Sequence, residues 1–169
     1  MGASVTIGNG SGNGSGNGSA GGVSGRSAVD TAREFVDAIV WGEHQKVWDL
    51  MGIEARTTVL KVASNRGMDE GLMARLRDGT AAPAERDEFL ADLVNGLRAD
   101  LAGNDLDALE YEEDPDPPEP GRARVVISVP VAVGFGGNLP VGSVELAAES
   151  STTGEAEWRI ERLVPQVTK

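Results

Sequence analysis

The sequence predicts an α+β fold in which N-terminal helices pack on a curved antiparallel sheet. Two observations predict it. Between residues 27 and 103, apolar side chains recur every three to four positions, as they do on one face of a helix. Between residues 106 and 165 they recur at every second position, as they do on one face of a strand. Helices followed by a run of antiparallel strands are typical of a domain whose helices cover one face of the sheet.

The chain of 169 residues divides into a tail and one domain. Residues 1–25 carry no charged side chain and hold ten of the 23 glycines, most of them in three copies of Gly-Asn-Gly-Ser. Such a segment has nothing to bury, so we expect a disordered tail. It could be native low-complexity sequence, an added linker, or the spacer of an exported protein that has lost its anchor. Residues 26–169 are then expected to form a single cone-like domain, with a helical part at 27–103 and a sheet part at 106–165.

The first helix has clear start and stop signals. Ser27 and Asp30 have the spacing of a capping box, and Gly42 is the residue type that ends a helix. Between them the apolar positions follow the helical period, which predicts one buried stripe. The stripe consists of Ala32, Phe35, Val36, Ile39 and Val40.

Further helices are predicted at about 43–51 and 54–65, and a short one around 72–76 that Gly79 closes. The helix at 54–65 is expected to turn Ala55, Val59, Val62 and Ala63 inward. The fifth helix is the most clearly marked. Pro83 suits its first turn, and Gly103 lies past its end. We expect the stretch from 54 to 103 to be a helical insert.

The strands follow from residue 109, and the longest runs from 124 to 133. Its alternation places Val125, Ile127, Val129, Val131 and Val133 on one face. Pro130 cannot donate to a neighbouring strand, so it indicates an edge or a bulge. Trp158 and Ile160 are expected on the inward face of the last strand.

Charge and composition exclude several classes of function. Fifteen basic residues against 27 acidic ones give a net charge of −12, which argues against binding of nucleic acid or anionic lipid. The chain has no cysteine and a single histidine, so we expect neither a metal centre nor a cofactor. No apolar run is long enough to span a membrane, and the first residues lack the features of a signal peptide. We therefore expect a cytoplasmic protein, with export of a longer precursor as the alternative.

Three segments resemble the nuclear transport factor two superfamily, the cystatin-like cone that includes SnoaL-like domains. They are the helix at 32–41, the short connection through Gly42 to the helix at 47–51, and the closing strand at 157–163 with its Trp-x-Ile pattern. The resemblance implies a conical cavity between the sheet and the first helices, used for small apolar ligands, for catalysis or for no chemistry. It also implies pairing of two copies through their sheets. We expect such a homodimer on the face that holds Val126, Ser128 and Ala132, unless the helical insert covers it.

The cavity implied by the resemblance has six candidate ligand-binding residues, which are Phe35, Ile39, Trp48, Tyr111, Val129 and Trp158. No catalytic residue can be assigned. His44 has only its neighbour Glu43 to orient it. Ketosteroid-type enzymes need a tyrosine near the first helix, and this helix has Phe35 but no tyrosine. The sequence therefore favours a non-catalytic domain that binds a small apolar ligand or a protein partner. The alternatives are a SnoaL-type isomerase, cyclase or hydrolase using carboxylates such as Glu145 or Glu149, and an accessory domain of an exported protein.

Overall fold

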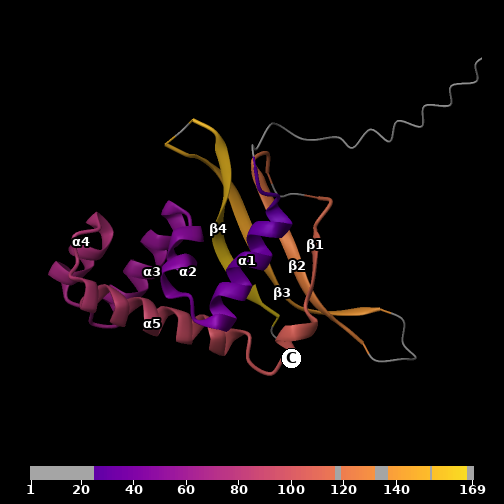
Figure 1. Ribbon diagram of the computed structural model, residues 1–169, viewed down its shortest axis with the longest axis horizontal. Coiled ribbons are helices and arrows are strands. Elements are labelled where there is room, and N and C mark those ends of the chain that lie inside the picture. Colours follow the sequence, from indigo (N-terminus) through magenta and orange to yellow (C-terminus); the bar gives the residue numbers. More distant parts are fainter. Residues whose placement is uncertain (1–24, 117–118, 132–136, 153, 167–169) are drawn as a thin grey trace, which may run out of the picture.

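The α+β architecture is confirmed by a computed structural model, which describes residues 25–116, 119–131, 137–152 and 154–166 (Figure 1). The predicted tail lies outside these residues, apart from Gly25. The helices are α1 (Ala28–Trp41), α2 (His44–Leu50), α3 (Ile53–Asn65), α4 (Glu70–Asp78) and α5 (Pro83–Asp100). The strands are β1 (Glu110–Glu113), β2 (Arg122–Pro130), β3 (Asn138–Ser150) and β4 (Ala156–Pro165). The predicted sheet part therefore starts too early, because residues Leu106–Ala108 form a turn of 3₁₀ helix.

The predicted helix ends are those of the structure. The side chain of Ser27 accepts a hydrogen bond from the backbone N–H of Asp30 at 3.0 Å, and Gly42 ends α1 in the left-handed region at φ +70°. Pro83 is the first residue of α5, and the carboxylate of Glu85 accepts from the N–H of Ala82 at 3.1 Å. These bonds satisfy backbone donors that a helix end leaves without an internal partner.

The sheet is an antiparallel meander in the order β1-β2-β3-β4, and it is not closed. The segment between α2 and α3 lies along the free edge of β4. Met51 bridges to Ile160 in parallel, and the N–H of Gly52 donates to the carbonyl of Ile160 at 2.8 Å. Ile53 is the first residue of α3, and its N–H donates a hydrogen bond of 2.9 Å to the carboxylate of Glu149 on β3. The start of α3 is thereby fixed to the sheet.

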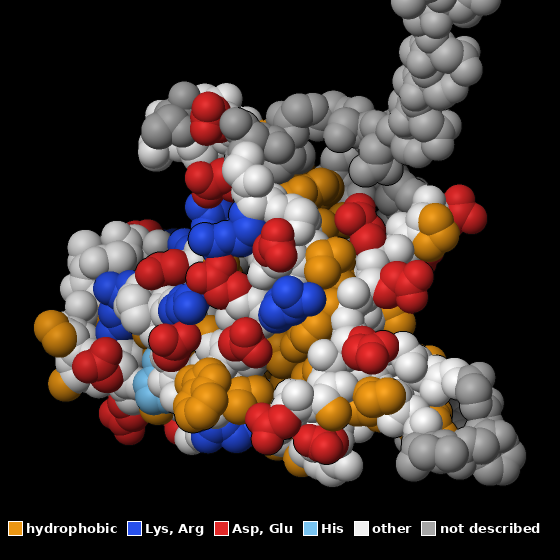
Figure 2. Space-filling model, turned by 45° about the vertical axis from the view of Figure 1, so that its right-hand side comes forward, with side chains coloured by type: hydrophobic (Ala, Val, Ile, Leu, Met, Phe, Trp, Pro, Cys, Tyr) orange, Lys and Arg blue, Asp and Glu red, His pale blue; other side chains and the backbone are white. Residues whose placement is uncertain are grey.

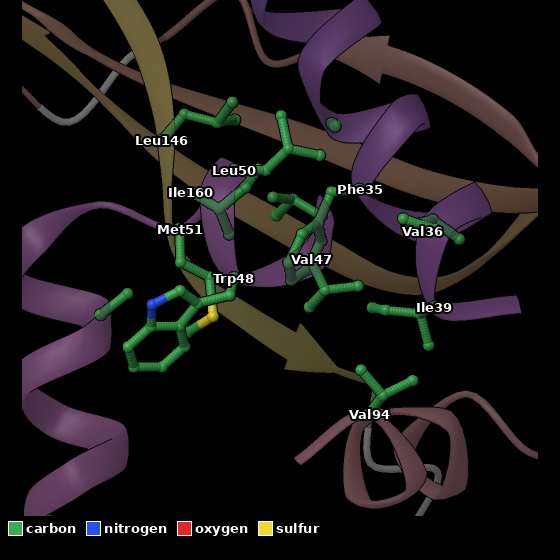
Figure 3. Close-up of a cluster of buried hydrophobic side chains, with 14 of the residues drawn as sticks. Phe35, Val36, Ile39, Val47, Trp48, Leu50, Met51, Val94, Leu146 and Ile160 are labelled. Atoms are coloured by element: carbon green, nitrogen blue, oxygen red, sulfur yellow. The ribbon is translucent and has the colours of Figure 1, made fainter. Parts of the chain in front are cut away.

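The core lies between α1, α2, α5 and one face of the sheet (Figures 1 and 3). The first helix supplies the predicted stripe, with Phe35 and Ile39 almost completely buried. Figure 3 shows these side chains gathered with others from α2, α5, β3 and β4. The fully buried partners include Val47, Val94, Leu146 and Ile160.

The strand predicted to be the longest is β2, but β3 is longer, and β2 departs from the predicted alternation after Ile127. The register between β2 and β3 shifts at this point, because Ile127 pairs with Gly142 and Ser128 pairs with Pro140, which leaves Val141 as an extra residue. A bulge of this kind bends the strands and increases their twist. Ser128 is consequently buried, whereas Val129 is half-buried and Val131 is 42% exposed. A bulge is therefore present two residues before Pro130. Val129 still packs against the core as predicted, whereas the inward placement of Val131 is wrong.

The predicted face of α3 needs a similar correction. Ala55 is buried as expected, and Leu60 is buried although the stripe omitted it. Val62 was expected inside but is 43% exposed. The reason is that α3 packs against β4 near its start and against α4, and a groove separates it from α5.

Candidate functional site

The most developed concave surface is an open groove of about 590 Å³ between α3 and α5, which we call the helical groove. The α5 wall consists of Phe89, Asp92, Leu93, Gly96, Leu97 and Asp100. Their spacing of three and four residues places them on one face of the helix. Val59, Val62, Ala63 and Arg66 form most of the α3 wall, and Met68 from the following turn closes one end.

The surface of the helical groove is largely apolar and only partly covered. Val59, Ala63, Met68, Leu93 and Leu97 are half-buried, and Val62 is more exposed than any of them. The rim is charged, with Asp92 and Asp100 on α5 and Arg66 directly after α3, all three exposed. Within the part of the chain that the structure describes, no ion pair involves any of these three residues.

Gly96 is the narrow point of the α5 wall. It lies in the interior of an 18-residue helix, where glycine is less favourable than alanine by about 1 kcal/mol. A Cβ atom added at Gly96 would meet no other atom within 4 Å. Packing inside the described chain therefore does not require a glycine here. The α3 wall also contains a small residue, Ala63.

A second cavity of about 430 Å³ continues from the groove, which we call the sheet pocket. The two share Thr58, Val59 and Leu97. The sheet pocket has an apolar part formed by Phe35, Met51, Ala55, Ile160 and Leu163. Its polar part consists of Glu54, Arg122, Glu145, Glu161 and Arg162.

The charged side chains of the sheet pocket hold one another. Arg122 forms an ion pair with Glu161, which is mostly buried, and lies 3.9 Å from Glu54. Burial raises the pKa of the Glu161 carboxyl; Arg122 opposes this shift, and Glu54 adds to it. Glu145 pairs with Arg162 at 2.7 Å and with Arg124 at 3.4 Å. These groups are already neutralised in pairs, which leaves none of them as an isolated buried charge.

Arg124, Glu145 and Arg162 form a row of charged side chains across the sheet. The three residues occupy neighbouring positions on β2, β3 and β4, and they alternate with the fully buried Val125 and Val144. They consequently lie on the face opposite the core. This is the face on which the sequence predicted a homodimer, and the homodimer stays a prediction.

Acidic side chains dominate the visible surface more generally. Figure 2 shows a face on which acidic side chains outnumber basic ones, with a strip of apolar surface between them. This agrees with the net charge of −12.

The six predicted cavity residues do not come together around one cavity. Phe35 lines the sheet pocket, whereas Ile39 belongs to the core. Trp48 is buried, and its ring meets the ring of Phe89 edge to face at 5.7 Å, directly behind the helical groove. Val129 and Trp158 are half-buried against the core, so Trp158 lies on the inward face as predicted but at its margin.

Tyr111 is half-buried on β1 beneath Arg33, whose guanidinium carbon lies 5.4 Å from the ring centre. Burial is the largest cause that raises the pKa of Tyr111 to about 12, and Asp37 adds to it while Arg33 opposes it. A phenol with so high a pKa stays protonated at neutral pH and keeps its O–H as a hydrogen-bond donor.

Sequence reasoning missed the residues that make the helical groove, among them Val62, Met68, Leu93 and Gly96. The signals were present. The apolar stripe of α5 is wider than one contact surface needs, and Gly96 interrupts a helix that is otherwise favourable. Val62 and Leu93 belong to the apolar stripes of their helices, and such positions were interpreted as core.

The carboxylates considered for catalysis are engaged in structural bonds. Glu149 caps the start of α3, and Glu145 is held between two arginines. His44 is the first residue of α2 and is half-buried. Among the described residues, no group of three histidine, aspartate or glutamate side chains is placed to hold a metal ion. None of the described helices has the length and apolar character needed to cross a bilayer.

Comparisons with protein-family models, with curated proteins and with solved structures gave no match. The resemblance to the nuclear transport factor two superfamily therefore stays a prediction. The site has to be interpreted from its own geometry.

Proposed function

We propose that this chain is a non-catalytic binding domain and that the helical groove is its binding surface. The observation that carries the proposal is the open apolar groove of about 590 Å³ between α3 and α5. Its volume lies in the range of roughly 300–1,000 Å³ that is usual for ligand sites, and its mixture of apolar walls and a few polar rim groups is the usual one. Apolar surface left in water costs about 25 cal/mol per Å², so a partner that covers these side chains gains free energy.

The charged groups nearby support binding rather than catalysis. A general acid or base must reach the reacting group with an exchangeable proton, and Glu145 and Glu149 are tied to arginines and to a helix start. Glu161 has a raised pKa, but Arg122 faces it directly. The sheet pocket then serves as an extension of the groove, in which the polar end of a ligand can reach paired charges beyond Leu97.

A neutral naphthylamine dye tests this proposal. N-phenyl-1-naphthylamine fluoresces strongly only in an apolar site and carries no charge that the acidic surface would repel. We expect the full chain to bind it, and Val62→Asp to weaken binding more than about fivefold because it places an unpaired charge in the groove. Val131→Asp is the matched control, since Val62 and Val131 are 43% and 42% exposed and Val131 does not line the groove.

Equal dye affinity of the two variants would contradict the proposal, provided that both unfold at the same urea concentration as the parent. A lower affinity of Val131→Asp alone would place the dye on the far part of the sheet. Either result would remove the helical groove as the binding surface.

A further inference from the structure

We infer that the occupant of the helical groove is an amphipathic helix of a partner protein, with basic residues along the edge that lies beside α5. This inference rests on the proposed function and specifies its ligand. Three features of the groove lead to it: its two helical walls, the open space at Gly96, and the distribution of charge on its rim.

The shape of the groove suits a third helix. Its α5 wall runs from Phe89 to Asp100, which corresponds to about 16 Å of helix. The α3 wall runs beside it from Thr58 to Arg66. Two helices that leave a gap between them present a trough into which the apolar face of another helix fits, with anchors three and four residues apart.

Gly96 indicates how closely that helix approaches. Inside the described chain nothing occupies the space next to its Cα atom, so the glycine has no packing reason in the free domain. A partner helix that passes over Gly96 and Ala63 would use that space, because small residues let two helix backbones come close together. A flexible small ligand would not need a glycine at one position of an otherwise apolar wall.

The charges on the groove rim indicate that the partner helix is basic on the side that lies beside α5. Asp92 and Asp100 stand on the α5 rim two helical turns apart, both exposed and without an ion pair in the described part of the chain. A helix lying along α5 would meet them with lysine or arginine side chains seven or eight residues apart. The net charge of −12 favours the approach of such a basic segment over that of an acidic one.

The test uses three labelled peptides of about 14 residues, long enough to cover the groove as a helix of about 21 Å. The first has leucines on one helical face and lysines on the other. The second contains the same residues in an order that destroys the apolar face. The third replaces every lysine by glutamate. Fluorescence anisotropy with the full chain measures the three affinities.

We expect the first peptide to bind at least about tenfold more tightly than either of the others. Gly96→Leu should weaken it by a similar factor, because its Cβ has no atom within 4 Å and the longer side chain takes up space that the peptide needs. Asp92→Asn with Asp100→Asn should weaken it about three- to tenfold, as for two exposed ion pairs. The control pair Glu112→Gln and Glu113→Gln removes two exposed carboxylates from β1 and should change the affinity less than about twofold.

Equal affinities of the ordered and shuffled peptides would overturn the inference, because binding would then come from attraction between opposite charges alone. An unchanged affinity of Gly96→Leu would overturn it as well, as would equal effects of the α5 pair and the β1 pair. If the dye binds in a manner that depends on Val62 but no peptide displaces it, the groove takes a small molecule and only this inference fails. If the parent sediments as a dimer that Gly96→Leu separates, the occupant is a second copy of the chain.

Discussion

Replacing Gly96 by alanine should stabilise the free domain, and the size of the effect follows from the local geometry. Alanine is about 0.8–1.0 kcal/mol more favourable than glycine in the interior of a helix. The added Cβ meets nothing within 4 Å, so no clash offsets this gain. For a domain of this size, about 1 kcal/mol corresponds to a rise in Tm of about 2–4 °C.

Gly79 provides a matched control. Its Cβ position is equally open, but the residue ends α4 in the left-handed region at φ +72°. Alanine is unfavourable there by about 1–2 kcal/mol. Urea denaturation of the two variants should therefore give changes in the free energy of unfolding of opposite sign. A destabilised Gly96→Ala would mean that α3 closes against α5 in solution, which would refute the open groove.

Four further predictions concern the core and the titrating groups. Phe35→Ala should lower the free energy of unfolding by about 3–5 kcal/mol, and Trp158→Ala should lower it clearly less, because the Trp158 side chain is only half-buried. Equal losses of stability in urea denaturation would contradict the described burial. Ser27→Ala should cost about 1 kcal/mol through loss of the cap on Asp30, and an unchanged urea midpoint would exclude that role. The single tyrosine should form phenolate, followed at 295 nm, only near pH 12, and Asp37→Asn should lower this value; a midpoint at the ordinary pH 10 would be inconsistent with a buried ring. Because the pKa of Glu161 is raised, the folded state binds the carboxyl proton more tightly than the unfolded state, and the contribution of Glu161 to stability falls as the pH rises above 4.5. The pKa of Glu85 is lowered, mainly by Arg75, so the contribution of Glu85 to stability is lost as the pH falls below 4.5. Glu161→Gln and Glu85→Gln should thus change the slope of stability against pH in opposite directions, and slopes of the same sign would contradict one of the two environments.

Local signals in the sequence were sufficient for the order of elements and for most helix ends. The cap at Ser27, the proline at the start of α5 and the glycines at 42 and 79 all act within a few residues, so their effect does not depend on the rest of the fold. The apolar stripe of α1 was also predicted correctly, because that helix has only one surface to cover.

The site could not be predicted, because it depends on where α3 lies relative to α5. A stripe of apolar residues has the same pattern whether a neighbour covers it or leaves it open. The start of α3 is fixed by the hydrogen bond between the Ile53 N–H and Glu149, which joins residues 96 positions apart. No local sequence pattern predicts such a contact. The bulge at Val141 acts in the same way, since it depends on pairing with another strand; Ser128 is buried beside it, and Val131, which was expected inside, is exposed.

The central claim is that the helical groove is the binding surface of this domain. Methyl-resolved NMR of the full chain, titrated with N-phenyl-1-naphthylamine, tests it most directly because it reports where the dye lies. We predict that the methyl signals of Val62, Leu93 and Leu97 shift in proportion to the bound fraction, while those of the exposed Val131 and Leu139 stay in place. Shifts confined to Val131 and Leu139, or spread equally over all five residues, would contradict the claim.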